Sequence, residues 1–260
     1  MVGAFNPEAV ARHIDAAHAS RAAYANLPPD LAPTSLADAY AAQQALARRL
    51  GPRLGGVAGL KIATTTRVMQ ELMGIDHPCG GVIFAASVHA SPAQIRLADH
   101  VHLMIECELA VRIGQALPNR PTPYTAETVR SAVATLMPAF ELIDDRHADY
   151  KTANALSLIA DNCWNAGVVL GSETPLGSAM SLSGITGTLD INGRPGGTGA
   201  TDGPLDALAW LANLAAGRGQ PLERGMVVIT GSVIPTLPIG PGDRLVFGLE
   251  GLGTVELRAL

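Results

Sequence analysis

The chain has 260 residues and a mass of 26.8 kDa, with 48% apolar and 16% charged residues. A composition this apolar excludes a disordered protein and supplies enough side chains for one sizeable core. The net charge is −5 and no basic cluster occurs in the sequence. This charge pattern argues against nucleic-acid binding and against an anionic membrane surface.

Cysteine usage and the first residues predict a cytoplasmic protein. Cys79, Cys107 and Cys163 form no CxxC pair, so neither a disulfide framework nor a zinc knuckle is expected. Glu8 and Asp15 lie where a secretion signal would need basic residues and then an apolar core. No apolar run approaches the ~18 residues of a membrane span. We therefore expect a soluble protein that is not exported.

Residues 1–50 are predicted to form an N-terminal helical region. Pro7 suits the first turn of a helix, and the Pro28–Pro29 pair interrupts the helical pattern. A second helix is predicted after Ser35, which suits the N-cap, and it should run to about Leu50. We expect this region to pack as an appendage on the rest of the chain.

From Val57 onward, short apolar runs separated by glycine and proline indicate strands. Three helices should interrupt them, over 66–73, from Thr125 to about Leu136, and from Pro204 to Gly217. Because strands and helices do not alternate regularly, residues 51–260 are predicted to form an α+β domain with a curved mixed sheet. The predicted strands cover 57–63, 82–85, 102–113, 138–143, 166–170, 186–191, 226–230, 244–248 and 253–258.

The glycine-rich segment 193–203 resembles a phosphate-binding loop only superficially. Asn192-Gly193 is a hairpin turn signal, and the segment lacks a P-loop lysine and an immediate strand-to-helix context. We expect a loop here and no nucleotide site.

Glu106 and Glu108 are the most informative residues of the chain. Both lie in the predicted strand from His102 to Ile113, where alternate residues share a face. Their Cα atoms would be roughly 6–7 Å apart, with Cys107 and Leu109 facing the other way. Two carboxylates on one side of an apolar strand repel each other and lose solvation, which a cation would relieve. The alternative is a pair of solvated glutamates on an exposed sheet face.

Glu141 adds a third carboxylate, as the lone acid in the apolar run Ala139–Ile143. Three oxygen ligands without histidine or thiolate favour Mg²⁺ or Mn²⁺. The histidines, among them His77, His100 and His102, lack metal-ligand spacing and are interpreted as surface or packing residues. Three glutamates and a divalent cation would together leave one negative charge. Lys61, in the apolar strand 57–63, would neutralise it.

Several motifs together resemble the 2-keto-4-pentenoate hydratase and 4-oxalocrotonate decarboxylase family of the fumarylacetoacetate hydrolase superfamily. They occur in order along nearly the whole chain, which makes the set far more specific than any single motif. The motifs are Gly59-Leu60-Lys61-Ile62, Gly74-Ile75-Asp76-His77-Pro78, Gly81-Val82-Ile83-Phe84, Glu106-Cys107-Glu108-Leu109-Ala110, Pro138 through Asp144, Ala160-Asp161-Asn162, Ala207 through Asn213, and Thr230-Gly231-Ser232.

The resemblance implies a mixed β-sheet roll of the fumarylacetoacetate hydrolase C-terminal type over 51–260, preceded by the helical region. It implies Mg²⁺ or Mn²⁺ at Glu106, Glu108 and Glu141, and a homo-oligomer. Lys61 matches the family's active-site lysine, and Ser232 matches a hydroxyl residue near the substrate carboxylate. Cys79, Met73 and Trp164 complete the expected substrate contacts.

Two positions depart from the family pattern. Hydratases commonly have Pro-Asp-Phe-Gly where this chain has Pro78-Cys79-Gly80-Gly81, so the acid expected beside the lysine is a cysteine. Many members follow Asp-Asn with Ala-Ser, whereas this chain has Cys163-Trp164. Without the acid, we expect a lower pKa for Lys61 than in a lysine–acid pair and slower hydration of a standard dienoate.

The activity predicted from the resemblance is a Mg²⁺-dependent lyase that adds water to a 2-hydroxy-2,4-dienoate or its 2-oxo tautomer. Its partner is thus a small 2-oxo or 2-hydroxy dienoic acid. The alternatives are a 4-oxalocrotonate-type decarboxylase, a repurposed 2-oxo-acid tautomerase or cyclase, and a non-catalytic subunit of a hydratase–decarboxylase complex.

Overall fold

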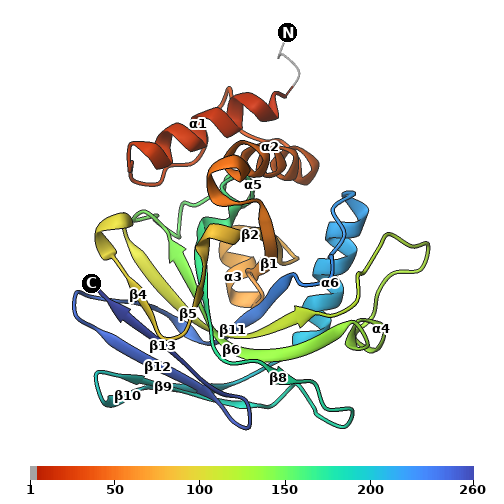
Figure 1. The fold of residues 1–260 in the computed structure, drawn as a ribbon. Helices are drawn as coiled ribbons and strands as arrows, with labels where there is room; N and C mark the ends of the chain where they lie inside the picture. The colour runs from red at the N-terminus through yellow and green to blue at the C-terminus, as the bar shows by residue number, and fades with distance from the viewer. Residues whose placement is uncertain (1–4) are drawn as a thin grey trace.

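A computed structural model describes residues 5–260 of the chain (Figure 1). Its helices and strands follow the order α1 (Pro7–Ala19), α2 (Leu36–Leu54), β1 (Val57–Ala63), α3 (Arg67–Met73), β2 (Cys79–Phe84), β3 (Val88–Ala90), β4 (Ala93–Ile95), β5 (Leu103–Ile113), α4 (Ala126–Arg130), β6 (Val133–Asp144), α5 (Ala155–Ala160), β7 (Asn165–Leu170), β8 (Thr174–Pro175), β9 (Thr186–Ile191), β10 (Arg194–Ala200), α6 (Pro204–Gly217), β11 (Val227–Pro238), β12 (Arg244–Leu249) and β13 (Gly253–Ala259). None of the helices within residues 5–260 is long and apolar enough to cross a membrane.

The strands form two sheets. The larger, eight-stranded sheet has the order β2-β1-β11-β5-β6-β7-β3, with β8 added on β6. It is mixed, because β1 runs parallel to β11 and β3 parallel to β7, whereas β11, β5, β6 and β7 are successively antiparallel. Contacts between β2 and β7 show that this sheet curls on itself. The α+β class and the curved mixed sheet are therefore confirmed.

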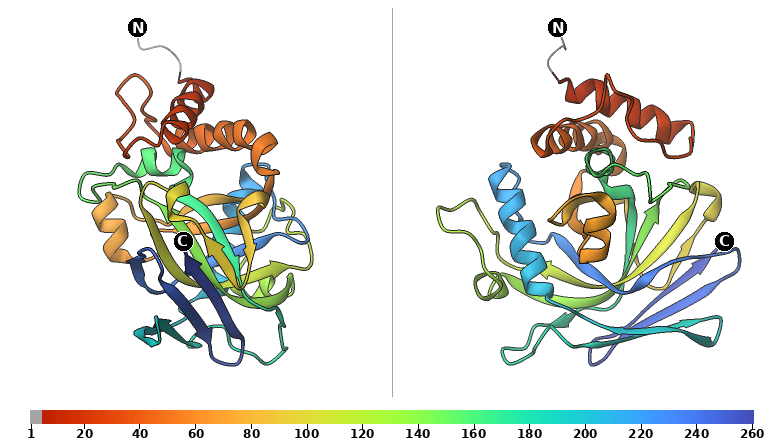
Figure 2. Two further views of the ribbon diagram at one scale, coloured as in Figure 1. Left: turned by 60° about the vertical axis from the view of Figure 1, so that its left-hand side comes forward. Right: turned by 180° about the vertical axis from the view of Figure 1, so that it is seen from behind.

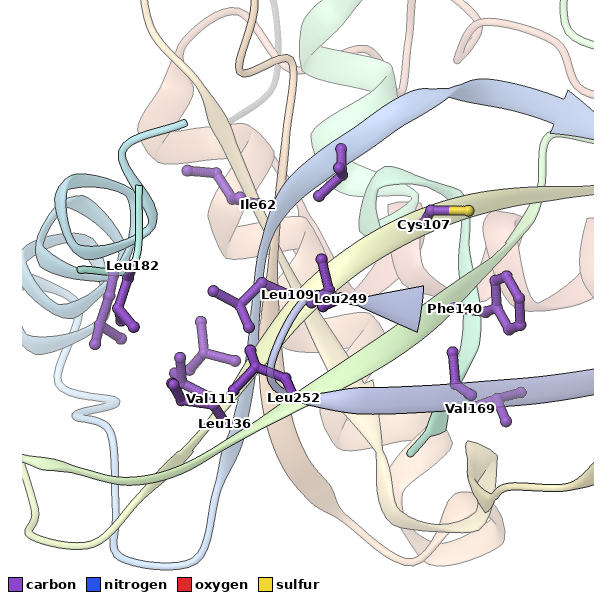
Figure 3. Packing of buried hydrophobic residues seen from close by; sticks show 14 of the residues in the cluster. Ile62, Cys107, Leu109, Val111, Leu136, Phe140, Val169, Leu182, Leu249 and Leu252 are labelled. Atoms are coloured by element: carbon purple, nitrogen blue, oxygen red, sulfur yellow. The ribbon is translucent and has the colours of Figure 1, made fainter. Parts of the chain in front are cut away.

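The second, five-stranded sheet has the order β10-β9-β12-β13-β4 and packs against the outer face of the roll. Alternation along β5 and β6 directs Cys107, Leu109 and Phe140 into the core between the two sheets (Figure 3). Phe140 meets Phe247 of β12 with ring centroids 6.1 Å apart. The intervening residues of β5 and β6, including the glutamates, consequently face the inside of the roll.

Helices α1 and α2 pack together at the end of the molecule opposite β12 and β13, as both views of Figure 2 show. Asn6 caps α1 and Ser35 caps α2, as predicted for Ser35. Helix α2 is hydrogen-bonded to the rest of the domain, because the Gln43 amide donates to the carbonyls of Gly80 and Ile159, both at 2.8 Å. Helix α2 therefore packs more closely on β2 and α5 than we expected of an appendage.

Helix α5 and the extension of β11 to Pro238 were not predicted, and two predicted segments have another secondary structure. The helix predicted from Thr125 to Leu136 ends at Arg130, and Val133 already begins β6. The strand is favoured over the predicted helix there, because Val133 and Leu136 are both buried while their backbones pair with β5. The glycine-rich segment predicted as a loop forms β10, which pairs with β9 through the expected Asn192-Gly193 turn. A side chain at Gly199 would meet the Val233 carbonyl at 1.9 Å, so glycine is required for this approach.

Candidate active site

The two central strands bring the three predicted glutamates together. Glu106 of β5 lies directly opposite Glu141 of β6, and Glu108 is two residues further along the same face. One carboxylate oxygen from each of the three lies within 4.8 Å of the others. The prediction that Glu106 and Glu108 share a face, with Cys107 on the other, is confirmed. The alternative of solvated glutamates is wrong for Glu108 and Glu141, which are fully buried.

Burial makes the ionised form of these carboxyl groups unfavourable. It raises the pKa of Glu108 well above the ordinary value, and the charges of Glu141 and Glu106 add to the effect. The pKa of Glu141 rises to about 7, because burial outweighs the attraction of Lys61. Ionised together, these carboxylates need a compensating positive charge.

The hydrogen bonds of the glutamates leave two oxygens free. Glu108 Oε2 accepts from the Gly231 backbone N–H at 2.6 Å, and Glu141 Oε1 accepts from Asn165 Nδ2 at 2.9 Å. Their second oxygens, Glu108 Oε1 and Glu141 Oε2, are buried without a hydrogen-bond partner. Thr236 donates to Glu106 Oε1 from the neighbouring strand β11. Free anionic oxygens gathered in this way suit a hard divalent cation such as Mg²⁺ or Mn²⁺.

Lys61 is held against the cluster by β1. Its Nζ lies 3.0 Å from Glu141 Oε1 and donates to the Cys163 carbonyl at 3.3 Å. Burial alone would lower the pKa of Lys61, but the nearby negative charges, with Glu141 first, raise it above its ordinary value. The expectation that Lys61 lacks an acid partner, and so has a lower pKa than in a lysine–acid pair, is therefore wrong, because Glu141 supplies that acid.

A glycine on the next strand makes room for this lysine. Gly81 of β2 pairs with Lys61, and a Cβ there would lie 3.0 Å from Lys61 Cγ and from the Asn162 carbonyl oxygen. Asn162 is itself fixed to β2, because its side chain exchanges hydrogen bonds with the backbone of Val82 at 2.7 and 2.9 Å. The Gly81-Val82 and Asp161-Asn162 motifs thus act together on one wall of the site.

A cavity of about 670 Å³ opens beside the glutamates and the lysine. Five predicted site residues line it, namely Lys61, Met73, Glu106, Trp164 and Ser232. Glu108 and Glu141 are not among the lining residues and lie buried next to Glu106. Cys79 does not line the cavity either.

Cys79 and Cys163, the two cysteines that depart from the family pattern, lie side by side. The Cys163 thiol hydrogen-bonds to Cys79, which lowers the pKa of Cys79 to about 7 and raises that of Cys163. Cys163 Sγ also lies 3.6 Å from the Gly80 carbonyl oxygen. The two departures, far apart in the sequence, are therefore one buried thiol pair at the edge of the site.

Sequence reasoning missed three polar residues of the site. Asn165 orients Glu141, Thr236 orients Glu106, and Tyr150 lines the cavity while donating to Asp145 Oδ2 at 3.0 Å. None lies in a recognisable motif, although Asn165 follows Asp161-Asn162 closely. Trp164, which was predicted, packs edge-on against Tyr150 with centroids 5.3 Å apart.

Comparison with known proteins agrees with this geometry. The family model described as fumarylacetoacetate (FAA) hydrolase C-terminal matches residues 61–259. The chain belongs to this family. Among curated relatives, it is 32% identical over 228 residues to the 2-keto-4-pentenoate hydratase of Paraburkholderia xenovorans (strain LB400), covering 84% of this chain and 82% of the relative. It is 28% identical over 256 residues to the 4-oxalocrotonate decarboxylase of Pseudomonas putida, covering 96% and 95%.

A solved family structure shows the same fold over nearly the full length. The 4-oxalocrotonate decarboxylase from Pseudomonas putida G7, complexed with magnesium and adipate, matches with a TM-score of 0.89 and 26% identity. The match covers 98% of this chain and 97% of that chain. A second structure of that decarboxylase, with calcium and acetate, matches with a TM-score of 0.87 and the same identity and coverage.

Proposed function

We propose that this family member is a Mg²⁺-dependent hydratase of 2-hydroxy-2,4-dienoates or their 2-oxo tautomers. One observation carries the proposal: three clustered glutamates leave buried oxygens unpaired beside a buried lysine, at the wall of a cavity. The magnesium and calcium complexes of the decarboxylase relative support a divalent cation at such a centre.

Glu106, Glu108 and Glu141 would hold the cation, and the fit rests on this chain's own atoms. Glu108 Oε1 and Glu141 Oε2 are buried without partners, whereas the remaining oxygens of these two residues are already bonded. A bound Mg²⁺ would supply Lewis-acid chemistry that stabilises negative charge developing on the 2-oxygen of a 2-oxo acid.

Lys61 would act in its charged form. Because Glu141 and the Cys163 carbonyl both contact Nζ, the ammonium is positioned and keeps its proton at neutral pH. It would stabilise charge on the substrate oxygen and give a carbon atom the proton that ketonisation requires, and Nζ would regain a proton as the enol hydroxyl loses its own. Water would then add to the conjugated alkene. Ser232 and Trp164, which line the cavity, would contact the substrate.

Decarboxylation of a vinylogous 2-oxo diacid is the second candidate. It is favoured by the full-length match to the decarboxylase, with a TM-score of 0.89. Both reactions pass charge onto the 2-oxygen, so the glutamates and Lys61 serve either one.

The deciding experiment incubates the Mg²⁺-loaded protein with 2-hydroxypenta-2,4-dienoate and with 2-oxo-hex-3-enedioate. A hydratase consumes the first, seen as loss of dienol absorbance, without releasing CO₂. Release of CO₂ from the second identifies a decarboxylase. If the Mg²⁺ form consumes neither acid, the proposal is wrong. The variant Lys61→Met serves as the control for a reaction that depends on the site.

We further propose that the protein self-associates, as the family resemblance implies, and that it can associate with a hydratase or decarboxylase relative. Light scattering of the purified chain, alone and mixed with such a relative, tests both statements. A monomeric mass in both samples would contradict them.

A further inference from the structure

Cys79 and Cys163, which both stand where the chain departs from the family pattern, meet in the fold. Cys79 begins β2, and Cys163 lies in the short 3₁₀ turn Asn162–Trp164 between α5 and β7. Both side chains are buried and belong to one packed cluster. Cys163 Sγ lies 3.6 Å from the carbonyl oxygen of Gly80, the residue that follows Cys79. The two thiols are hydrogen-bonded to each other, although they are far apart in the sequence.

The backbone around Cys163 holds its thiol beside Cys79. Asn162, Cys163 and Trp164 have positive φ angles of 53°, 50° and 57°. This left-handed conformation is rare for residues other than glycine, so the surrounding contacts must impose it. One such contact is the pair of hydrogen bonds between the Asn162 side chain and Val82 of β2. The turn is therefore anchored on the strand that carries Cys79.

Cys163 connects the thiol pair to the cavity and to the lysine of the site. The residue lines the cavity of about 670 Å³, as does the next residue, Trp164. Its carbonyl oxygen accepts a hydrogen bond from Lys61 Nζ at 3.3 Å. A reagent as small as hydrogen peroxide can thus approach Cys163 through the cavity, and any displacement of Cys163 acts on Lys61.

We propose that Cys79 and Cys163 form an oxidation site, at which hydrogen peroxide joins them in a disulfide and draws the Cys163 carbonyl away from Lys61. Peroxide converts one thiol to a sulfenic acid and releases one water. The other thiol attacks that sulfur, which forms the S–S bond and releases a second water. The two thiols lose two electrons in total, and one peroxide is reduced to two waters.

The hydrogen bond between the sulfurs favours this reaction. Once one thiol is ionised, the remaining S–H donates to the thiolate, and this lowers the pKa of Cys79 to about 7. The thiolate is the form that attacks a peroxide. Because the remaining proton can pass between the two bonded sulfurs, Cys163 can present the thiolate on the side of the cavity.

Closing the disulfide weakens the contact between Cys163 and Lys61. Cys79 is fixed in β2 by its pairing with Ala63 of β1, so the approach of the sulfurs falls mainly on Cys163 in its turn. An S–S bond is about 2.05 Å long, much shorter than a hydrogen-bonded contact between two sulfurs. The bond of 3.3 Å to Lys61 Nζ is already long, so a small shift breaks it. The ammonium then keeps Glu141 and loses the second contact that positions it.

The first measurement detects the disulfide itself. The reduced protein is treated with hydrogen peroxide at neutral pH, its remaining thiols are alkylated in denaturant, and it is digested without reductant. We expect a peptide that links Cys79 to Cys163, with Cys107 recovered as the alkylated thiol. Cys107 faces the core between the two sheets, so it serves as the unpaired control (Figure 3). Absence of the linked peptide, or equal oxidation of Cys107, would overturn the inference.

The second measurement connects the disulfide to Lys61, and this part rests on the proposed function. Oxidation should lower kcat of the Mg²⁺-loaded protein by about tenfold or more, the effect of losing one hydrogen bond to a charged group. Dithiothreitol should restore it. Calorimetric binding of Mg²⁺ should be retained, because the glutamates accept hydrogen bonds from Gly231, Asn165 and Thr236 and not from either thiol.

Two variants separate the thiol pair from other oxidation, each compared with its own reduced form. Cys79→Ser removes one sulfur and should keep its turnover in peroxide, whereas Cys107→Ala should lose turnover as the parent does. Methionines also line the cavity, among them Met69 and Met73, and their oxidation is not reversed by dithiothreitol. A loss of turnover that Cys79→Ser shares, or that dithiothreitol does not reverse, would contradict the role of the disulfide.

The two measurements distinguish this inference from the proposed function. A linked peptide with a reversible loss of turnover supports both. A linked peptide with full turnover overturns the coupling to Lys61 and leaves the proposed function intact. If the reduced protein turns over neither test acid, the proposed function fails, and the linked peptide still decides whether Cys79 and Cys163 form the oxidation site.

Discussion

Raising the pH without divalent metal should destabilise the protein through its buried glutamates. The pKa of Glu141 rises from the ordinary 4.5 to about 7 in the fold, chiefly because of burial. The unfolded chain therefore releases this proton near pH 4.5, whereas the native state keeps it until about pH 7. Stability contributed by the protonated form is complete below the lower pKa and is lost as the pH rises through the folded pKa.

The size of this effect follows from the two pKa values. A separation of about 2.5 pH units corresponds to about 3 kcal/mol of unfolding free energy for Glu141 above pH 7. Glu108, whose pKa is also raised, changes stability in the same direction. For a chain of this size, about 3 kcal/mol corresponds to a change in Tm of roughly 10 °C.

A bound divalent cation removes most of this penalty, while protons compete with it at low pH. The assay is thermal unfolding in Mg²⁺ and in EDTA, at pH 5 and at pH 8. The difference in Tm between the two conditions should be small at pH 5 and about 10 °C at pH 8. Taking this difference at each pH cancels other carboxyl groups that titrate equally in both solutions.

Two variants make the pH experiment specific. Glu108→Gln should lose most of the Mg²⁺-dependent gain, because it removes a buried anionic oxygen. Glu250→Gln alters an exposed glutamate outside the cluster and should behave as the parent. A Tm difference that is equal at both pH values, or larger at pH 5, would refute the assignment of the raised pKa values to a metal-binding cluster.

Further predictions concern the individual residues of the site. Calorimetric titration of Mg²⁺ into Glu108→Gln should show weakened binding, and a titration matching the parent would contradict the ligand role. Lys61→Met should still bind Mg²⁺ but lose turnover by about 10²–10⁴, the usual contribution of a positioned acid or base; unchanged turnover would remove Lys61 from the mechanism. Cys79→Asp should lower the free energy of unfolding by about 3–5 kcal/mol without raising turnover, because it buries a new charge away from the cavity. Cys79→Ser is its control, and faster hydration by Cys79→Asp would restore the earlier view that an acid is missing. Metal analysis should find activity following Mg²⁺ or Mn²⁺, and stoichiometric Zn²⁺ with matching activity would contradict an all-oxygen centre.

The local sequence pattern determined the glutamates of the candidate site. The alternation Glu106-Cys107-Glu108 predicted which side chains share a face, since successive residues of a strand point in opposite directions. The lone acid Glu141 in an apolar run was a signal of the same kind. Caps such as Ser35 and turns such as Asn192-Gly193 were also predictable, because they depend on residues that are adjacent in the chain.

Only the tertiary structure decided which distant groups meet. The β5–β6 register sets Glu106 opposite Glu141, and the β1–β2 pairing with Gly81 gives Lys61 its place at Glu141 rather than at Cys79. Long-range pairing with β5 also turned residues 133–136 into a strand, because buried backbone groups must find hydrogen-bond partners. Sequence alone could not place Cys79 against Cys163, since this contact depends on packing between segments far apart in the chain.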